Sequence, residues 1–91
     1  MAKIVLFKDI NYGGGALVLT GADSDLGPQG WNDKVSSLIV IDGTWNLYKD
    51  SNYGGTKWSV SANGGPSSDG TYNDWSSWGG TNDSISSLKP A

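Results

Sequence analysis

The eight residues FKDINYGG at positions 7–14 return as YKDSNYGG at positions 48–55. Six of the eight positions are identical, and a seventh exchanges one aromatic residue for another. In each stretch an aromatic residue ends a strand, the chain folds back, and a second aromatic residue, Tyr12 or Tyr53, is expected to pack over the fold. The closing glycine permits a backbone conformation that a Cβ atom would oppose. The repeat therefore predicts a folded β-hairpin that occurs twice.

A second repeat lies further along each half of the chain. The sequence NDKVSSL occupies residues 32–38, and NDSISSL occupies residues 82–88. The hairpin repeats are 41 positions apart and these repeats are 50 apart, so the second half contains nine additional residues. We expect one all-β domain of two motifs, at about residues 1–42 and 43–91, with an insertion at about residues 64–80.

Short runs of β-branched and aromatic residues between glycine-rich turns predict short strands, and no segment shows a sustained helical period. Two motifs of about four strands each predict a sandwich of two packed sheets with about eight strands. Six strands are expected at residues 3–8, 16–20, 38–41, 45–49, 56–61 and 86–89. A further short strand is expected before each Asn-Asp pair, near residues 29–31 and within residues 69–78.

The composition argues against several classes of function. The 91 residues include 6 Lys and 9 Asp but no Arg, Glu, His or Cys, and the net charge is −3. Disulfides, thiolate or imidazole zinc sites and His-based catalysis are therefore ruled out, and we do not expect an enzyme. No basic patch is available for nucleic acid, and no apolar run approaches the ~20 residues that span a bilayer. The first residues carry no secretory signal pattern, and the sequence does not indicate the cellular compartment of the protein.

The two repeats together resemble the βγ-crystallin family. An aromatic residue, four residues, an aromatic residue, one residue and Gly is the family's hairpin pattern, and NDxxSS matches its Asn/Asp-Asn/Asp-x-x-Ser/Thr-Ser loop. Both patterns occur twice, in the family's order, and cover nearly the whole chain. The chain looks most like the microbial, single-domain, calcium-binding members. The resemblance implies a βγ-crystallin-like sandwich of two Greek-key motifs. The insertion departs from the family pattern, as do Lys8 and Lys49, where several relatives have an acidic residue.

The resemblance also implies two calcium ions whose ligands are exchanged between the motifs. In the family, each ion takes a side-chain oxygen and a carbonyl from one Asn-Asp loop, a hydroxyl from the other loop and a hairpin carbonyl. Carried over to this chain, the ligands are Lys8, Asn32, Asp33, Lys34, Ser36, Lys49, Asn82, Asp83, Ser84 and Ser86. Ser36 and Ser86 are the exchanged hydroxyls, and which atom of each Asn-Asp pair faces the ion stays open. Because each loop supplies one carboxylate, we expect micromolar to sub-millimolar affinity.

The residues also allow three other interpretations. The Asn-Asp loops could be simple polar turns, since Asn and Asp bond their own backbone. Trp75 and Trp78 could form a platform for a glycan or protein partner, although packing of the insertion onto the sandwich is the favoured reading. The acidic stretch at residues 23–27 is expected to be a polar turn. Neither a membrane nor a nucleic-acid partner is expected, and the chain is expected to be a monomer.

Overall fold

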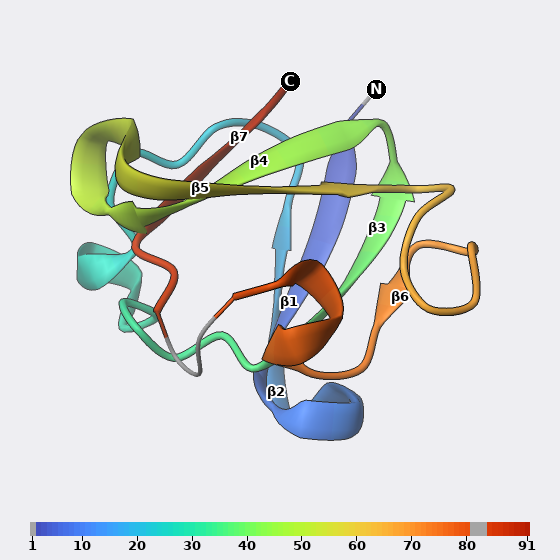
Figure 1. Ribbon diagram of the computed structural model, residues 1–91. Coiled ribbons are helices and arrows are strands. Elements are labelled where there is room, and N and C mark those ends of the chain that lie inside the picture. Colours follow the sequence, from blue (N-terminus) through green and yellow to red (C-terminus); the bar gives the residue numbers. More distant parts are fainter. Residues whose placement is uncertain (1, 81–83) are drawn as a thin grey trace.

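The computed structural model describes residues 2–80 and 84–91 and shows seven strands in two antiparallel sheets (Figure 1). The four-stranded sheet has the order β2-β1-β3-β6, and the three-stranded sheet has the order β5-β4-β7. The strands are β1 (Lys3–Asp9), β2 (Gly13–Leu19), β3 (Ser37–Asp42), β4 (Thr44–Asp50), β5 (Gly54–Ser61), β6 (Thr71–Tyr72) and β7 (Ser87–Pro90). The helical segments of these residues are four short 3-10 turns: η1 (Ile10–Tyr12), η2 (Gly27–Gln29), η3 (Ser51–Tyr53) and η4 (Trp75–Trp78). The all-β sandwich predicted from the repeats is confirmed.

Each half of the chain contributes a segment to the other half's sheet. Strand β6, from the second half, pairs with β3 of the first half, where Tyr72 lies opposite Leu38. In return Asp23, from the first half, forms an isolated bridge with Leu88 of β7. The two N–H···O distances of that bridge are 2.9 and 3.0 Å. Backbone pairing thus joins the two halves directly.

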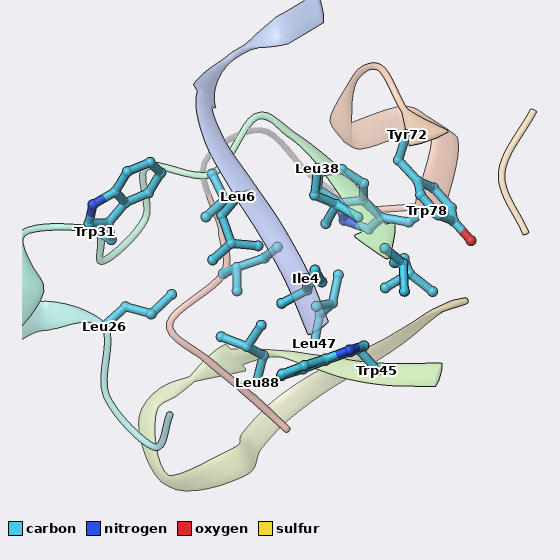
Figure 2. Packing of buried hydrophobic residues seen from close by; sticks show 14 residues of the cluster. Ile4, Leu6, Leu26, Trp31, Leu38, Trp45, Leu47, Tyr72, Trp78 and Leu88 are labelled. Atoms are coloured by element: carbon cyan, nitrogen blue, oxygen red, sulfur yellow. The ribbon is translucent and has the colours of Figure 1, made fainter. Parts of the chain in front are cut away.

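Alternate residues of the strands fill the space between the sheets (Figure 2). Ile4 and Leu6 of β1 are fully buried, and so are the residues 41 positions later, Trp45 and Leu47 of β4. Burying one side chain of this size contributes about 1.5–3 kcal/mol relative to leaving it exposed. The sequence repeat is therefore a repeat of core positions, one set for each sheet.

The structure corrects one expectation about strands. Residues 29–31 do not form a strand, because η2 begins at Gly27 and the chain turns again at Gly30, where φ is +74° and the backbone N–H bonds the Gly27 carbonyl. Pro28, inside this turn, has no N–H to give to a sheet. The described residues consequently form seven strands, close to the expected number of about eight. The bridge at Asp23 takes the place expected for the missing strand.

The insertion packs against the sandwich, which is the arrangement that the sequence analysis favoured for Trp75 and Trp78. The indole of Trp78 is 8% exposed, joins the core cluster and lies 6.4 Å from the ring of Tyr72. Asp74 caps η4 by accepting a hydrogen bond from the Ser77 N–H. The Asn73 carbonyl accepts from the Asn11 N–H at 2.7 Å, which ties the insertion to the first hairpin. In the described part of the chain no helix is long and apolar enough to cross a membrane.

Candidate metal site

The two hairpins have matching geometry. The rings of Phe7 and Tyr12 meet edge to face at 5.6 Å, and those of Tyr48 and Tyr53 do so at the same distance. Each fold passes through two residues in the left-handed region, an Asn followed by a Tyr. The next turn needs glycine as predicted: Gly14 has φ +78°, and a Cβ there would lie 2.5 Å from an Asp9 carboxylate oxygen. The aromatic packing predicted for both hairpins is confirmed.

The hairpin fold places Lys8 and Lys49 outside the regular ladder. In the β1–β2 pair the register shifts after Phe7 and resumes at Asp9, so that Lys8 has no cross-strand partner. The β4–β5 pair shifts in the same way around Lys49. Residues at such a bulge have backbone groups that the ladder does not use. These are the two residues whose carbonyls the sequence predicts as metal ligands.

A serine clasp holds each loop against its own hairpin. The Ser37 hydroxyl donates to the Asp9 carbonyl at 2.6 Å and accepts from the Tyr12 N–H at 3.0 Å. Ser87 makes the same two bonds, to the Asp50 carbonyl and from the Tyr53 N–H, at the same distances. Sequence reasoning missed this role, although a second Ser at the end of both NDxxSS copies was the available signal. The clasp fixes the loop beside the bulge.

Buried polar side chains are concentrated in the two loops. In the described residues every buried polar side chain is a serine of residues 32–37 (the first loop) or 82–87 (the second loop): Ser36, Ser37, Ser84, Ser86 and Ser87. A hydroxyl removed from water must have a hydrogen-bond or metal partner to offset its desolvation. The two loops are therefore more than solvated turns, because each of them places serine hydroxyls in the interior.

A hollow of about 250 Å³ opens beside the first loop. It is lined by Lys8 and Asp9 from the end of β1 and by Asp33 and Lys34 from the loop. Three of these four residues belong to the predicted ligand set, and Asp9 is an addition. Asp33 has φ +56°, a conformation that Asp tolerates better than most residues. Asn32, another predicted ligand of this loop, is exposed next to Asp33.

The second half of the chain contacts Asp33, one of the residues that line this hollow, through Ser86. The Ser86 hydroxyl donates to an Asp33 carboxylate oxygen at 3.2 Å, across 53 positions of sequence. The Asp33 N–H also bonds the Ile85 carbonyl at 3.0 Å. A hydroxyl from one motif and a carboxylate from the other thus meet beside the first loop. This is the pair of groups that the exchanged-ligand prediction brings together.

The second loop is described in part. Asn82 and Asp83, predicted as ligands, lie outside the described residues. The Ser86 N–H bonds the Tyr48 carbonyl at 2.9 Å, and the Ser36 N–H bonds the Phe7 carbonyl at the same distance. The fifth position of each loop is therefore held beside its own hairpin, next to Lys49 in one case and Lys8 in the other.

Charges around the hollow are balanced. Its lining holds two carboxylates, of Asp9 and Asp33, and two lysines. The Lys8 ammonium lies 5.1 Å from the centre of the Trp31 ring, a cation–π contact that gives this charge a partner of its own. Nowhere in residues 2–80 and 84–91 do three Asp side chains gather. A cation here would depend on carbonyl and hydroxyl oxygens as much as on carboxylates.

The acidic stretch before η2 is a polar turn. Asp23 accepts from the Asp25 N–H at 3.0 Å, and Asp25 accepts from the Gly27 N–H at 2.9 Å. Asp23 also bonds the Gln29 side-chain amide. Both carboxylates are thus engaged with neighbouring groups, as expected for this stretch.

Comparison with known proteins identifies the family. The Beta/Gamma crystallin family matches residues 3–91. The chain belongs to the β/γ-crystallin family. A β/γ-crystallin of Ciona intestinalis is 40% identical over 89 residues, which cover 98% of each chain.

Solved β/γ-crystallin structures have the same fold. One from Ciona intestinalis matches with a TM-score of 0.87 and 39% identity, covering 98% of this chain and 99% of the other. One from an archaeon matches with a TM-score of 0.85 and 32% identity, covering 99% and 98%. These relatives are single-domain β/γ-crystallins, as the resemblance implied. They come from the invertebrate Ciona intestinalis and from an archaeon.

Proposed function

We propose that this β/γ-crystallin domain binds two Ca²⁺ ions and that the bound ions fasten its two motifs to each other. The observation that carries the proposal is the meeting of the Ser86 hydroxyl with the Asp33 carboxylate beside the hollow at Lys8 and Lys34. The first ion would take the Asp33 or Asn32 side chain, the Lys34 carbonyl, the Ser86 hydroxyl and the carbonyl of Lys49, the hairpin residue next to Ser86. The hydrogen bond from Ser86 to Asp33 then stands where the ion would bring the same two groups together.

The second ion follows from the repeat of the same parts. Its ligands would be Asn82, Asp83, the carbonyls of Ser84 and Lys8, and the Ser36 hydroxyl. Support comes from the equivalent bulges at Lys8 and Lys49, and from the matching 2.9 Å backbone bonds that hold Ser36 next to Lys8 and Ser86 next to Lys49. Each motif then contributes to both ions.

The donor set favours calcium over magnesium. Carbonyls, hydroxyls and one carboxylate per loop are hard oxygen ligands, and Ca²⁺ accepts six to eight of them in flexible geometry at about 2.3–2.6 Å. Mg²⁺ requires a tight octahedron near 2.0–2.1 Å and gives up its waters reluctantly. The balanced charge of the hollow and the single loop carboxylate place the affinity in the micromolar to sub-millimolar range.

Calorimetric titration of the whole chain with CaCl₂ tests the proposal. We expect two bound ions per chain and little heat from MgCl₂. Asp33→Asn should weaken the first site at least about tenfold, because it removes the carboxylate charge next to the ion. Absence of binding in the wild-type chain would refute the function itself.

Asp25→Asn is the matched control. It removes the same unit charge from the polar turn before η2, where the remaining side-chain oxygen can still accept from the Gly27 N–H. Its titration should match the wild type. Equal weakening by both substitutions would mean that only the net charge matters and that the hollow is not the site.

Removal of the exchanged hydroxyl tests how the motifs share the ions. Ser86→Ala should weaken the ion at the first loop, and Ser36→Arg should abolish the ion at the second loop. Unchanged stoichiometry and affinity in both variants would contradict the exchange while leaving calcium binding intact.

No observation favours the alternative of a glycan platform in the insertion. Trp78 is buried in the core, and Trp75 packs partly against the same cluster. The buried Trp78 ring offers no free face to a sugar, and the Trp75 ring is only partly exposed. The domain is therefore proposed as a structural calcium-binding module and not as an enzyme or a lectin.

A further inference from the structure

The outer face of the four-stranded sheet carries apolar side chains. The register sets Val5 of β1 opposite both Val18 of β2 and Ile39 of β3, so these three residues lie on one face in a row across the sheet. Val18 is 52% exposed, and Ile41, two residues beyond Ile39, is 53% exposed. The opposite face of the same strands holds core residues such as Ile4. We refer to Val5, Val18, Ile39 and Ile41 as the apolar row.

The chain itself shows that the fold does not require this row. The repeat offsets of 41 and 50 place the equivalents of Val5, Val18 and Ile39 on the outer face of the three-stranded sheet. There Asn46 takes the place of Val5 and lies opposite Ser59 and Lys89, which take the places of Val18 and Ile39. All three of these residues are polar. Ile41 corresponds to the small residue Ala91. An apolar surface confined to one of two similar sheets indicates a contact surface.

We infer that the apolar row is the interface of a symmetric dimer, in which a second copy of this chain packs on the outer face of the four-stranded sheet. The sheet order β2-β1-β3-β6 allows a two-fold axis between the two stacked sheets. The axis is parallel to the strands and lies over the middle of the sheet, between β1 and β3. This axis sets Val5 of one copy opposite Ile39 of the other. It also sets Val18 of one copy opposite Thr71 of the other, and Thr71 is the β6 residue that pairs with Ile39 of β3. The same patch then serves both copies, as a two-fold interface requires.

Charge complementarity supports a second copy as the occupant. Lys3 of β1 and Asp42 of β3 are register partners at one end of the row, and both are exposed. The same two-fold axis places Lys3 of each copy opposite Asp42 of the other copy. Opposite charges that face each other across an interface fix its register and disfavour other arrangements.

The size of the surface predicts a weak dimer. A stable interface covers about 800 Å² per partner. The whole domain exposes 4334 Å², so such an interface would need nearly a fifth of its surface. One face of a short sheet is at the low end of this range. We therefore expect dimers to form at tens to hundreds of micromolar, in contrast to the monomer expected from the sequence.

Sedimentation of the full chain from about 10 μM to about 1 mM, with calcium and with chelator, tests the interface. The wild type should shift from monomer to dimer. Ile39→Lys should raise the dimer Kd at least about tenfold, because it buries an unpaired charge. The second half carries Lys at the equivalent position, so the fold accommodates this residue. Ser59→Lys, on the outer face of the other sheet, is the matched control and should leave the Kd unchanged.

Charge reversal tests the position of the axis. Lys3→Asp should weaken the dimer at least about tenfold, and Lys3→Asp combined with Asp42→Lys should restore it. Melting temperatures of the dilute variants separate a folding defect from a loss of association. A wild type that stays monomeric at 1 mM (about the highest practical concentration), or a dimer that Ile39→Lys leaves intact, would overturn the proposal. Failure of the double variant to restore association would overturn the two-fold arrangement.

Discussion

At the scale of single residues, the serine clasp is the most consequential contact. Ser37 is fully buried and satisfies both a carbonyl and an N–H of the hairpin. Ser37→Ala leaves both groups without that partner, so we expect a loss of about 1–3 kcal/mol in the free energy of unfolding. Urea denaturation in the presence of chelator measures this loss without any contribution from metal.

Ser59→Ala provides the comparison for the clasp. The Ser59 hydroxyl donates to the exposed side chain of Asn46, where water can replace it. The expected change in the free energy of unfolding is within about 0.5 kcal/mol. If both alanine variants lose the same stability, the clasp has no special structural weight.

At the scale of elements, the 3-10 turn η4 positions the insertion. Asp74 accepts from the Ser77 N–H and from the Ser76 hydroxyl, and Trp78 at the end of the turn enters the core. Asp74→Ala should lower the free energy of unfolding by about 1 kcal/mol through loss of the cap, and should weaken the near-UV circular dichroism of the tryptophans. Ser76→Ala keeps the capping oxygen and should change neither quantity. An equal loss in both variants would contradict the role of the cap.

At the scale of the whole molecule, calcium should act on the stability of both motifs at once. Free Ca²⁺ at about 100 times the dissociation constant adds about 2.7 kcal/mol per site. For a domain of this size the melting temperature should therefore rise by about 10 °C or more. Differential scanning calorimetry with calcium, with magnesium and with chelator measures the shift. A melting temperature that calcium and chelator leave equal would contradict the structural role of the ions.

The proposed dimer interface and the candidate site at the first loop lie in separate parts of the molecule. The apolar row lies on the outer face of the four-stranded sheet, whereas the hollow lies where β1 ends beside the first loop. Substitutions at Ile39 should therefore leave the calcium titration unchanged. Asp33→Asn should likewise leave the association constant unchanged.

The sequence by itself determined the fold class, the two hairpins and the family, because these depend on local chemistry that is written twice. Gly14 is required by its own backbone angle, and Tyr12 packs on a ring only five positions away. The alternation of Ile4 and Leu6 needs no distant information to predict a buried strand face.

Only the tertiary structure decided which distant groups meet. It brings Ser86 to Asp33 across 53 positions and gives Ser37 its place as a clasp. It also replaces the strand expected at residues 29–31 by the bridge at Asp23, because the turn at η2 takes the chain away from the sheet. Sheet pairing and side-chain packing fix such contacts only once both halves are folded together. For the same reason the outward direction of the apolar row follows from the register of three strands and not from any one of them.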